Sequence, residues 1–193
     1  MATHSGNYFL TTEQMKDNAR YIRDYLTARG WSINAVCGML GNMETESTIN
    51  PGIWQNLDAG NTSLGYGLVQ WTPATKYLNW CSENGYQPSL LSTALKRLEY
   101  EVDNNLQYYS TDAYPLSFVE FKTSKLAPSY LAMAFLNNYE RPTEPNQPAR
   151  GVQADAWYTY LTDSNTPTGG VSVYQNTKSM SLLLKYVATK GGF

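Results

Sequence analysis

Two glutamates near the predicted end of a helix are the residues of this sequence best suited to acid chemistry. Glu44 and Glu46 lie in the segment 41–47, just before a turn predicted at Asn50-Pro51-Gly52. An apolar surrounding disfavours the charged form of a carboxyl group, and the C-terminal end of a helix dipole acts in the same direction. A carboxyl that keeps its proton near neutral pH can serve as a general acid. The pattern alone is a weak signal, because glutamates also decorate solvated helix ends.

Other catalytic chemistries fit the sequence poorly. His4 is the single histidine, and neither Cys37 nor Cys81 has a histidine near it in the sequence to act as a base. We therefore expect no Cys-His or Ser-His hydrolase and no histidine-ligated metal site, with His4 in an unstructured end. Both cysteines fall at apolar helical positions, which favours two free buried thiols over a Cys37–Cys81 disulfide.

The composition excludes several classes of partner. The net charge is −2 without a basic block, so no nucleic-acid binding is expected. No apolar run reaches the roughly 18 residues that a membrane span requires, and residues 1–8 lack the features of a signal peptide. Charged residues make up 16% of the chain, and tyrosine occurs sixteen times. Tyrosine rings suit either a core or a surface that holds a polar ring such as a sugar.

The candidate acid is expected at the edge of a helix's buried face. Thr11 begins a first helix with a capping box, and Gly30 ends it. Ser32 caps a second helix with an apolar stripe at Val36, Leu40 and Met43, which places Glu46 near its C-terminal end. Gly38 and Gly41 share one side of this helix and predict a close neighbour there.

Residues 53–71 contain the only β structure that the sequence predicts. Segments 53–56 and 66–71 have the pattern of short strands, and residues 58–62 have turn chemistry. A hairpin beside a helical lobe makes a cleft, in which Gln70 is placed to bind a sugar or position a water molecule.

Helices dominate the rest of the chain. They are predicted to begin at Thr72-Pro73, to follow the stripe Leu91, Leu95, Leu98 and Val102, and to cover 117–122, a segment opening at Ala127-Pro128, and a final segment through Ala154, Trp157 and Leu161. The fold class is α+β, mainly α. We expect one domain at 1–162, a linker at 163–172, and a tail at 173–193 that begins a truncated second domain.

Several motifs in fixed order resemble one known family over roughly residues 8–163. Glu46-Ser47 followed by Gly67-Leu68-Val69-Gln70 is similar to the lysozyme and soluble lytic transglycosylase superfamily. The closer resemblance is to phage tail-tip lysozymes, in particular the tail-knob cell-wall-degrading proteins of phi29-like phages. It is carried by Cys37-Gly38-Met39-Leu40-Gly41-Asn42-Met43, Ile49-Asn50-Pro51-Gly52, Trp54-Gln55-Asn56-Leu57-Asp58, Gly67-Leu68-Val69-Gln70-Trp71-Thr72-Pro73 and Tyr139-Glu140-Arg141-Pro142.

The resemblance implies a lysozyme-like fold and assigns roles to individual residues. Glu46 matches the catalytic glutamate, and Ser47, Gln70 and Tyr139 match positions that orient it or line the sugar cleft. Asp58 is the first candidate for a second carboxylate and Glu140 the other, although a salt bridge explains Glu140 equally well. Stacking surface for sugars is expected from Trp54, Tyr66 and Trp71, whereas Glu44 is expected at the surface or rim.

The function expected from these assignments is hydrolysis of the β-1,4 bond between N-acetylmuramic acid and N-acetylglucosamine in peptidoglycan. Glycan strands and phage tail proteins are the expected partners, and no cofactor or metal is implied. A place in the virion tail, acting on the bacterial wall, fits a chain without a signal peptide. The alternatives are a lytic transglycosylase, which uses the same Glu46 but lets the sugar's own 6-hydroxyl attack, and a non-catalytic wall-binding or structural tail module.

Overall fold

Helix α2 (Ile33–Ser47) lies at the centre of the fold and packs against α1, α5, α6 and α7. The computed structural model describes residues 2–163. The other elements there are α1 (Thr12–Thr27), η1 (Gln55–Leu57), α3 (Thr75–Glu83), α4 (Leu91–Asp103), α5 (Phe118–Thr123), α6 (Pro128–Phe135), the π-helical turn η2 (Leu136–Glu140) and α7 (Ala149–Thr162).

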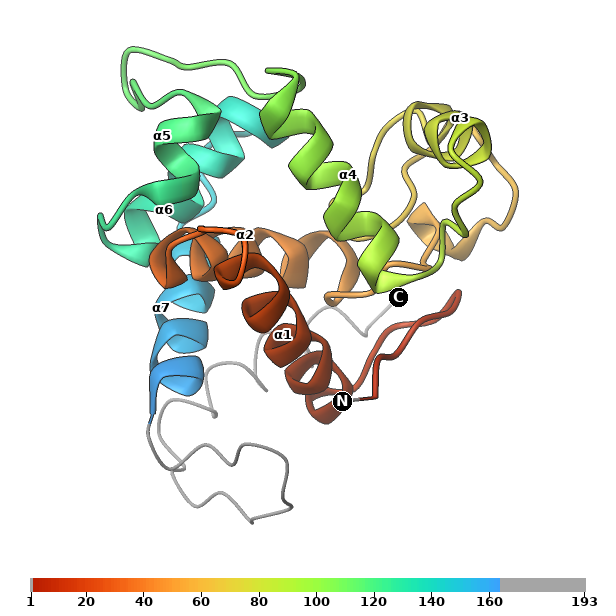
Figure 1. The fold of residues 1–193 in the computed structure, drawn as a ribbon, viewed down its shortest axis with the longest axis horizontal. Helices are drawn as coiled ribbons and strands as arrows, with labels where there is room; N and C mark the ends of the chain where they lie inside the picture. The colour runs from red at the N-terminus through yellow and green to blue at the C-terminus, as the bar shows by residue number, and fades with distance from the viewer. Residues whose placement is uncertain (1, 164–193) are drawn as a thin grey trace.

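The helices fall on two sides of this centre. Helices α5, α6 and α7 lie on one side, and α3 lies on the other together with the irregular chain that follows α2 (Figure 1). Helix α4 crosses from the α3 side to the α5 side, so it connects the two parts of the molecule (Figure 1). None of the helices in residues 2–163 is long and apolar enough to span a membrane.

Local capping signals place most helix starts correctly. Thr11 and Gln14 form the predicted capping box of α1, and the Ser32 hydroxyl accepts a hydrogen bond from the backbone N–H of Ala35 at the start of α2. Ser117 caps α5. Helix α3 is an exception, because it begins at Thr75 with Ala74 as its N-cap rather than at Thr72-Pro73.

The two glycines of α2 allow its neighbours to approach as predicted. A Cβ atom on Gly41 would lie 2.3 Å from the carbonyl oxygen of Arg150, and one on Gly38 would lie 2.8 Å from Cβ of Leu131. Real Cβ atoms do not reach such distances, so α6 and α7 pack almost directly on the α2 backbone. This close contact brings the N-terminal turn of α7 beside the C-terminal end of α2.

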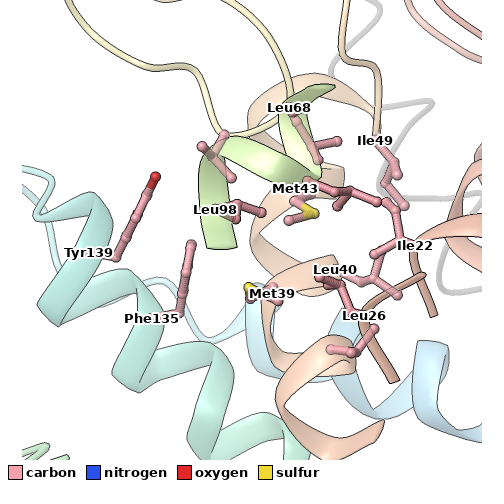
Figure 2. Close-up of a cluster of buried hydrophobic side chains, with 14 of the residues drawn as sticks. Ile22, Leu26, Met39, Leu40, Met43, Ile49, Leu68, Leu98, Phe135 and Tyr139 are labelled. Atoms are coloured by element: carbon pink, nitrogen blue, oxygen red, sulfur yellow. The ribbon is translucent and has the colours of Figure 1, made fainter. Parts of the chain in front are cut away.

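The core surrounds α2 and continues toward its C-terminal end. Figure 2 shows Met39, Leu40 and Met43 of α2 between Ile22 and Leu26 of α1 on one side and Phe135 on the other. Leu68, from the segment after η1, packs into the same cluster and is fully buried (Figure 2). Cys37 and Cys81 are buried free thiols, as favoured from their positions.

The predicted β-hairpin over 53–71 is wrong. Residues 2–163 contain only isolated bridges in this region, where Tyr66 pairs with both Trp54 and Trp71. The segment expected as the second strand folds back on itself, because Gly67 and Gln70 take left-handed φ values of 83° and 49°. Two positive φ values within six residues prevent an extended strand, and the segment becomes a tight loop closed by the mutual backbone hydrogen bonds of Tyr66 and Trp71.

The expectation that His4 lies in an unstructured end is also wrong. Its Nε2 lies 2.9 Å from Oδ2 of Asp17, and its backbone exchanges two hydrogen bonds with the buried side chain of Asn18. The buried amide of Asn50 holds the same N-terminal segment by donating to the carbonyl oxygens of residues 6 and 8. Apart from Asp163, the linker expected at 163–172 and the tail at 173–193 lie outside the described residues.

Candidate active site

Glu46 lies on the last turn of α2 and points toward the start of α7. Its Oε1 accepts a hydrogen bond from Nη2 of Arg150 at 2.5 Å, and its side chain is 23% exposed. Its Oε2 has no hydrogen-bond partner within residues 2–163. The side chain thus has one oxygen fixed by the protein and one available to a ligand, as expected for a group at the edge of a buried face.

Other hydrogen bonds hold the Arg150 side chain in place beside Glu46. Its residue is 4% exposed, its Nε donates to the side-chain oxygen of Gln147, and its Nη1 donates to Oδ1 of Asn42. Asn42 is fully buried on α2 and donates in turn to the backbone of Gly38 and Ala132. Such a chain of hydrogen bonds holds the guanidinium, and therefore the Glu46 carboxyl, in one place.

A second carboxyl, that of Glu140, lies close enough to Glu46 and Arg150 for their charges to change its pKa. Glu140, at the end of η2, is partly exposed as a residue, but its Oε1 is buried and has no hydrogen-bond partner in the described chain. Burial raises the pKa of Glu140 well above its ordinary value, and the negative charge of Glu46 raises it further, while Arg150 opposes both effects. Two carboxyl groups beside one buried arginine favour a state in which Glu140 keeps its proton.

Glu44 is not at the surface or rim as expected. It is 4% exposed, and Oε2 accepts a hydrogen bond of 2.8 Å from the indole N–H of Trp157 on α7. Four residues after Leu40, it faces the helices packed on α2 rather than solvent. Burial raises the pKa of Glu44 to about 7, although the Trp157 hydrogen bond opposes the shift.

Two of the expected sugar-binding residues instead hold the loop after η1. The Ser47 hydroxyl is fully buried and lies 2.7 Å from the Leu68 carbonyl oxygen, to which it donates. The Gln70 amide donates to the carbonyl oxygens of Gly67 and Ile53, at 3.0 and 3.3 Å. Its Oε1 is buried and has no partner within residues 2–163. A role for these two side chains in sugar contact stays a prediction.

Trp71 and Tyr139 are core residues in this structure. They are 3% and 1% exposed, and both donate to the buried carboxyl of Glu101 on α4. Neither ring offers a free face to a sugar here, so the burial does not support the stacking and cleft-lining roles predicted for them.

The remaining predicted site residues lie in and beside the loop after η1. Trp54 is half-buried and its ring centroid is 4.7 Å from that of Tyr66, which is 5% exposed. Asp58 is exposed and accepts a hydrogen bond from the Asn61 amide at 2.8 Å. Glu46 forms an ion pair with Arg150, and its charge raises the pKa of Glu140. Within residues 2–163, no such interaction connects Glu46 with Asp58.

Sequence reasoning missed Arg150 and Glu101, although a signal for each was present. Arg150 lies four residues before Ala154, and Glu101 lies three residues after Leu98, so both are charged residues at positions of apolar helical stripes. A charge on such a stripe indicates a buried partner, because an unpaired buried charge is costly. Residues 2–163 contain no group of three His, Cys, Asp or Glu side chains that could hold a metal ion.

Comparison with known proteins identifies the family of this chain. The family model for phage tail lysozyme matches residues 17–161, which include Glu46, Glu140 and Arg150. Morphogenesis protein 1 of Bacillus phage B103 is 57% identical over 159 residues, which are 82% of this chain and 43% of that relative. The chain thus spans less than half the length of this curated relative. It belongs to the phage tail lysozyme family.

Proposed function

We propose that this chain hydrolyses the β-1,4 bond between N-acetylmuramic acid and N-acetylglucosamine in peptidoglycan, as part of a phage tail that degrades the bacterial wall during infection. The observation that carries the proposal is the Glu46 carboxyl, held by Arg150 on one oxygen and open on the other. Membership of the phage tail lysozyme family supports the substrate class, and the relative's name supports the phage setting.

Glu46 is the group assigned to deliver the proton to the glycosidic oxygen. It is the more accessible member of the Glu46–Glu140 pair, and the C-terminal end of α2 directs it away from the core. One oxygen of Glu46 accepts a hydrogen bond from Arg150, and the other is open to the glycosidic oxygen that receives the proton. Glu140 keeps its own proton because burial raises its pKa, so it adds no second negative charge beside Glu46.

The second function of a glycosidase site is to stabilise the oxocarbenium-like sugar, or to activate the water that attacks it. Asp58 stays the sequence-based candidate for this function, in an exposed loop where Asn61 is its hydrogen-bond partner. Glu140 is the other sequence-based candidate for this function, and the charges of Glu46 and Arg150 act on its carboxyl.

Substitution of Glu46 by Gln, with Glu44→Gln as matched control, tests the proposal. Both changes remove one carboxylate from the same helix, but Glu44 is buried against Trp157 rather than open to a ligand. We expect Glu46→Gln to lower the release of reducing ends from purified peptidoglycan by about 10²–10⁴-fold, the usual contribution of a general acid. Glu44→Gln is expected to keep the wild-type rate.

The products distinguish the proposed reaction from its alternatives. Mass spectrometry of the digest is expected to find reducing N-acetylmuramic acid ends. Anhydromuramic ends would contradict hydrolysis and indicate a lytic transglycosylase. Wild-type chain that binds walls but releases no fragments would contradict an enzyme altogether and indicate a wall-binding tail module.

A further inference from the structure

A buried carboxylate on α4 joins three separate parts of the fold. Glu101 is 1% exposed and accepts three hydrogen bonds: from Nε of Arg97 at 2.8 Å, from the indole N–H of Trp71 at 3.0 Å, and from the hydroxyl of Tyr139 at 2.6 Å. Arg97 lies on α4 itself, Trp71 closes the loop after η1, and Tyr139 belongs to η2. Figure 2 shows Tyr139 beside Phe135, with its hydroxyl oxygen at the end directed away from its own helix.

The partners of Glu101 are the direct neighbours of Glu140, on which the charges of Glu46 and Arg150 act, and of Gln70, whose contact with a sugar stays a prediction. Trp71 follows Gln70, and Tyr139 precedes Glu140. We propose that Glu101 is a positioning residue for the glycosidase site: it fixes Gln70 and Glu140 relative to each other by holding the residue next to each of them. This inference rests on the proposed function and extends it to a side chain that does not touch the substrate.

A carboxylate suits the three donors better than an amide does. Arg97 and Trp71 donate to Oε1, and Tyr139 donates to Oε2. An amide would place its NH₂ group against the Tyr139 hydroxyl, which would have to turn and accept, and would lose the charge that pairs with Arg97. Burial raises the pKa of Glu101, and the hydrogen bonds from Tyr139, Arg97 and Trp71 together with the charge of Arg97 offset part of this cost. The Arg97 and Glu101 side chains are almost withdrawn from solvent, at 12% and 1% exposure. The network is therefore fully satisfied, which is the condition under which buried polar groups make a structure rigid.

The charge of Glu101 also reaches Glu140 directly. The charged groups that act on Glu140 come from each element around it: Glu46 on α2, Arg150 on α7, Glu101 on α4, and Arg141 next to it. Glu46 and Glu101 raise its pKa, and the two arginines lower it. Glu101 thus contributes to keeping the proton on Glu140 as well as to holding the backbone that carries it.

Two substitutions separate position from charge, and a third serves as control. Tyr139→Phe removes one hydrogen bond but keeps the Glu101 charge, whereas Glu101→Gln removes the charge as well. The matched control is Tyr77→Phe, which also deletes the hydroxyl of a fully buried tyrosine, but one that donates to the Pro88 carbonyl rather than to Glu101. Its ring stacks on Trp71 and is kept in the variant. Circular dichroism and thermal unfolding establish that each variant is folded at the assay temperature.

Kinetics on soluble peptidoglycan fragments give the first readout. We expect kcat to fall about 10²-fold in Glu101→Gln, the loss typical of a misplacement of about 1 Å in an active site. A smaller fall in kcat is expected in Tyr139→Phe. KM is expected to stay within about threefold of wild type in both variants, and Tyr77→Phe is expected to keep the wild-type kcat.

If Glu101→Gln does not fold, the comparison of Tyr139→Phe with Tyr77→Phe still tests the proposal. Equal losses in those two variants, or full activity in a folded Glu101→Gln, would overturn the proposal.

A titration of the Glu140 carboxyl by carbon-13 NMR gives a readout that does not depend on activity. The resonance is assigned by its loss in Glu140→Gln. Its apparent pKa is expected to fall in Glu101→Gln and to show no such fall in Tyr139→Phe, where the Glu101 charge remains. An unchanged titration in Glu101→Gln would refute the link between the two residues. A wild-type chain without activity would refute the proposed function instead, and the titration would still test Glu101.

Discussion

Glu44 carries a buried carboxyl with only part of its hydrogen-bonding capacity used. Trp157 donates to Oε2, and the nearby Gln153 amide also lowers the pKa, but Oε1 is buried and has no hydrogen bond of good geometry within the described chain. Glu44→Gln replaces this group by one of the same shape that cannot ionise and still accepts the indole hydrogen bond. The substitution is therefore expected to stabilise the chain at neutral and alkaline pH.

The size of the effect follows from the pKa of Glu44, which rises from 4.5 in the unfolded chain to about 7 in the fold. Below pH 4.5 the Glu44 carboxyl is protonated in both the folded and the unfolded chain, so its ionisation does not lower the free energy of unfolding. As the pH rises to about 7 the unfolded chain loses this proton while the folded chain keeps it, so the free energy of unfolding falls by about 1.4 kcal/mol per pH unit. The total loss is about 3 kcal/mol, and it is complete just above pH 7.

Urea unfolding followed by tryptophan fluorescence at pH 4 to 8 measures this effect as a difference between variant and wild type. The difference is expected to be near zero at pH 4 and to reach about 3 kcal/mol in favour of Glu44→Gln at pH 8. Glu83→Gln is the control, because that carboxyl is exposed at the end of α3. A difference for Glu44→Gln that does not change with pH would refute the argument from burial.

Two further substitutions test the packing that positions the site. Gly41→Ala is expected to destabilise the fold by about 1–3 kcal/mol in urea unfolding, because its Cβ would lie 2.3 Å from the Arg150 carbonyl oxygen; a neutral effect would contradict direct contact between α2 and α7. Ser47→Ala is expected to cost about 1–3 kcal/mol, since it leaves the buried Leu68 carbonyl without its donor. The control is Ser63→Ala, where an exposed hydroxyl is lost; equal losses for the two serines would argue against the role given to Ser47.

Features that depend on neighbouring residues in the chain were predictable. The caps at Thr11 and Ser32 stabilise helix starts through hydrogen bonds to residues three positions further on, so their sequence pattern is sufficient. Gly38 and Gly41 also predicted a close neighbour correctly, since a glycine pair in a helix is unfavourable unless packing requires it. The periodicity of 91–102 gave α4 almost to the residue.

The segment 53–71 shows where local patterns fail. Its alternating residues are typical of strands, but a strand also needs a partner in register, and propensity for strand structure depends on such contacts. Here Leu68 enters the core and Ser47 holds its carbonyl oxygen, so tertiary contacts stabilise a tight loop instead. The fixed position of His4 likewise depends on Asp17 and Asn18, which the chain brings near only after folding.

The sequence by itself determined the helices and the place of Glu46 at the edge of a buried face, because both follow from spacing along one helix. Only the tertiary structure decided which charged groups surround that carboxyl. Arg150 is 104 residues away in the chain and reaches Glu46 because α7 packs on the glycines of α2. Glu140 and Glu101 come from two further elements, and their protonation depends on burial and on charges that no local pattern contains.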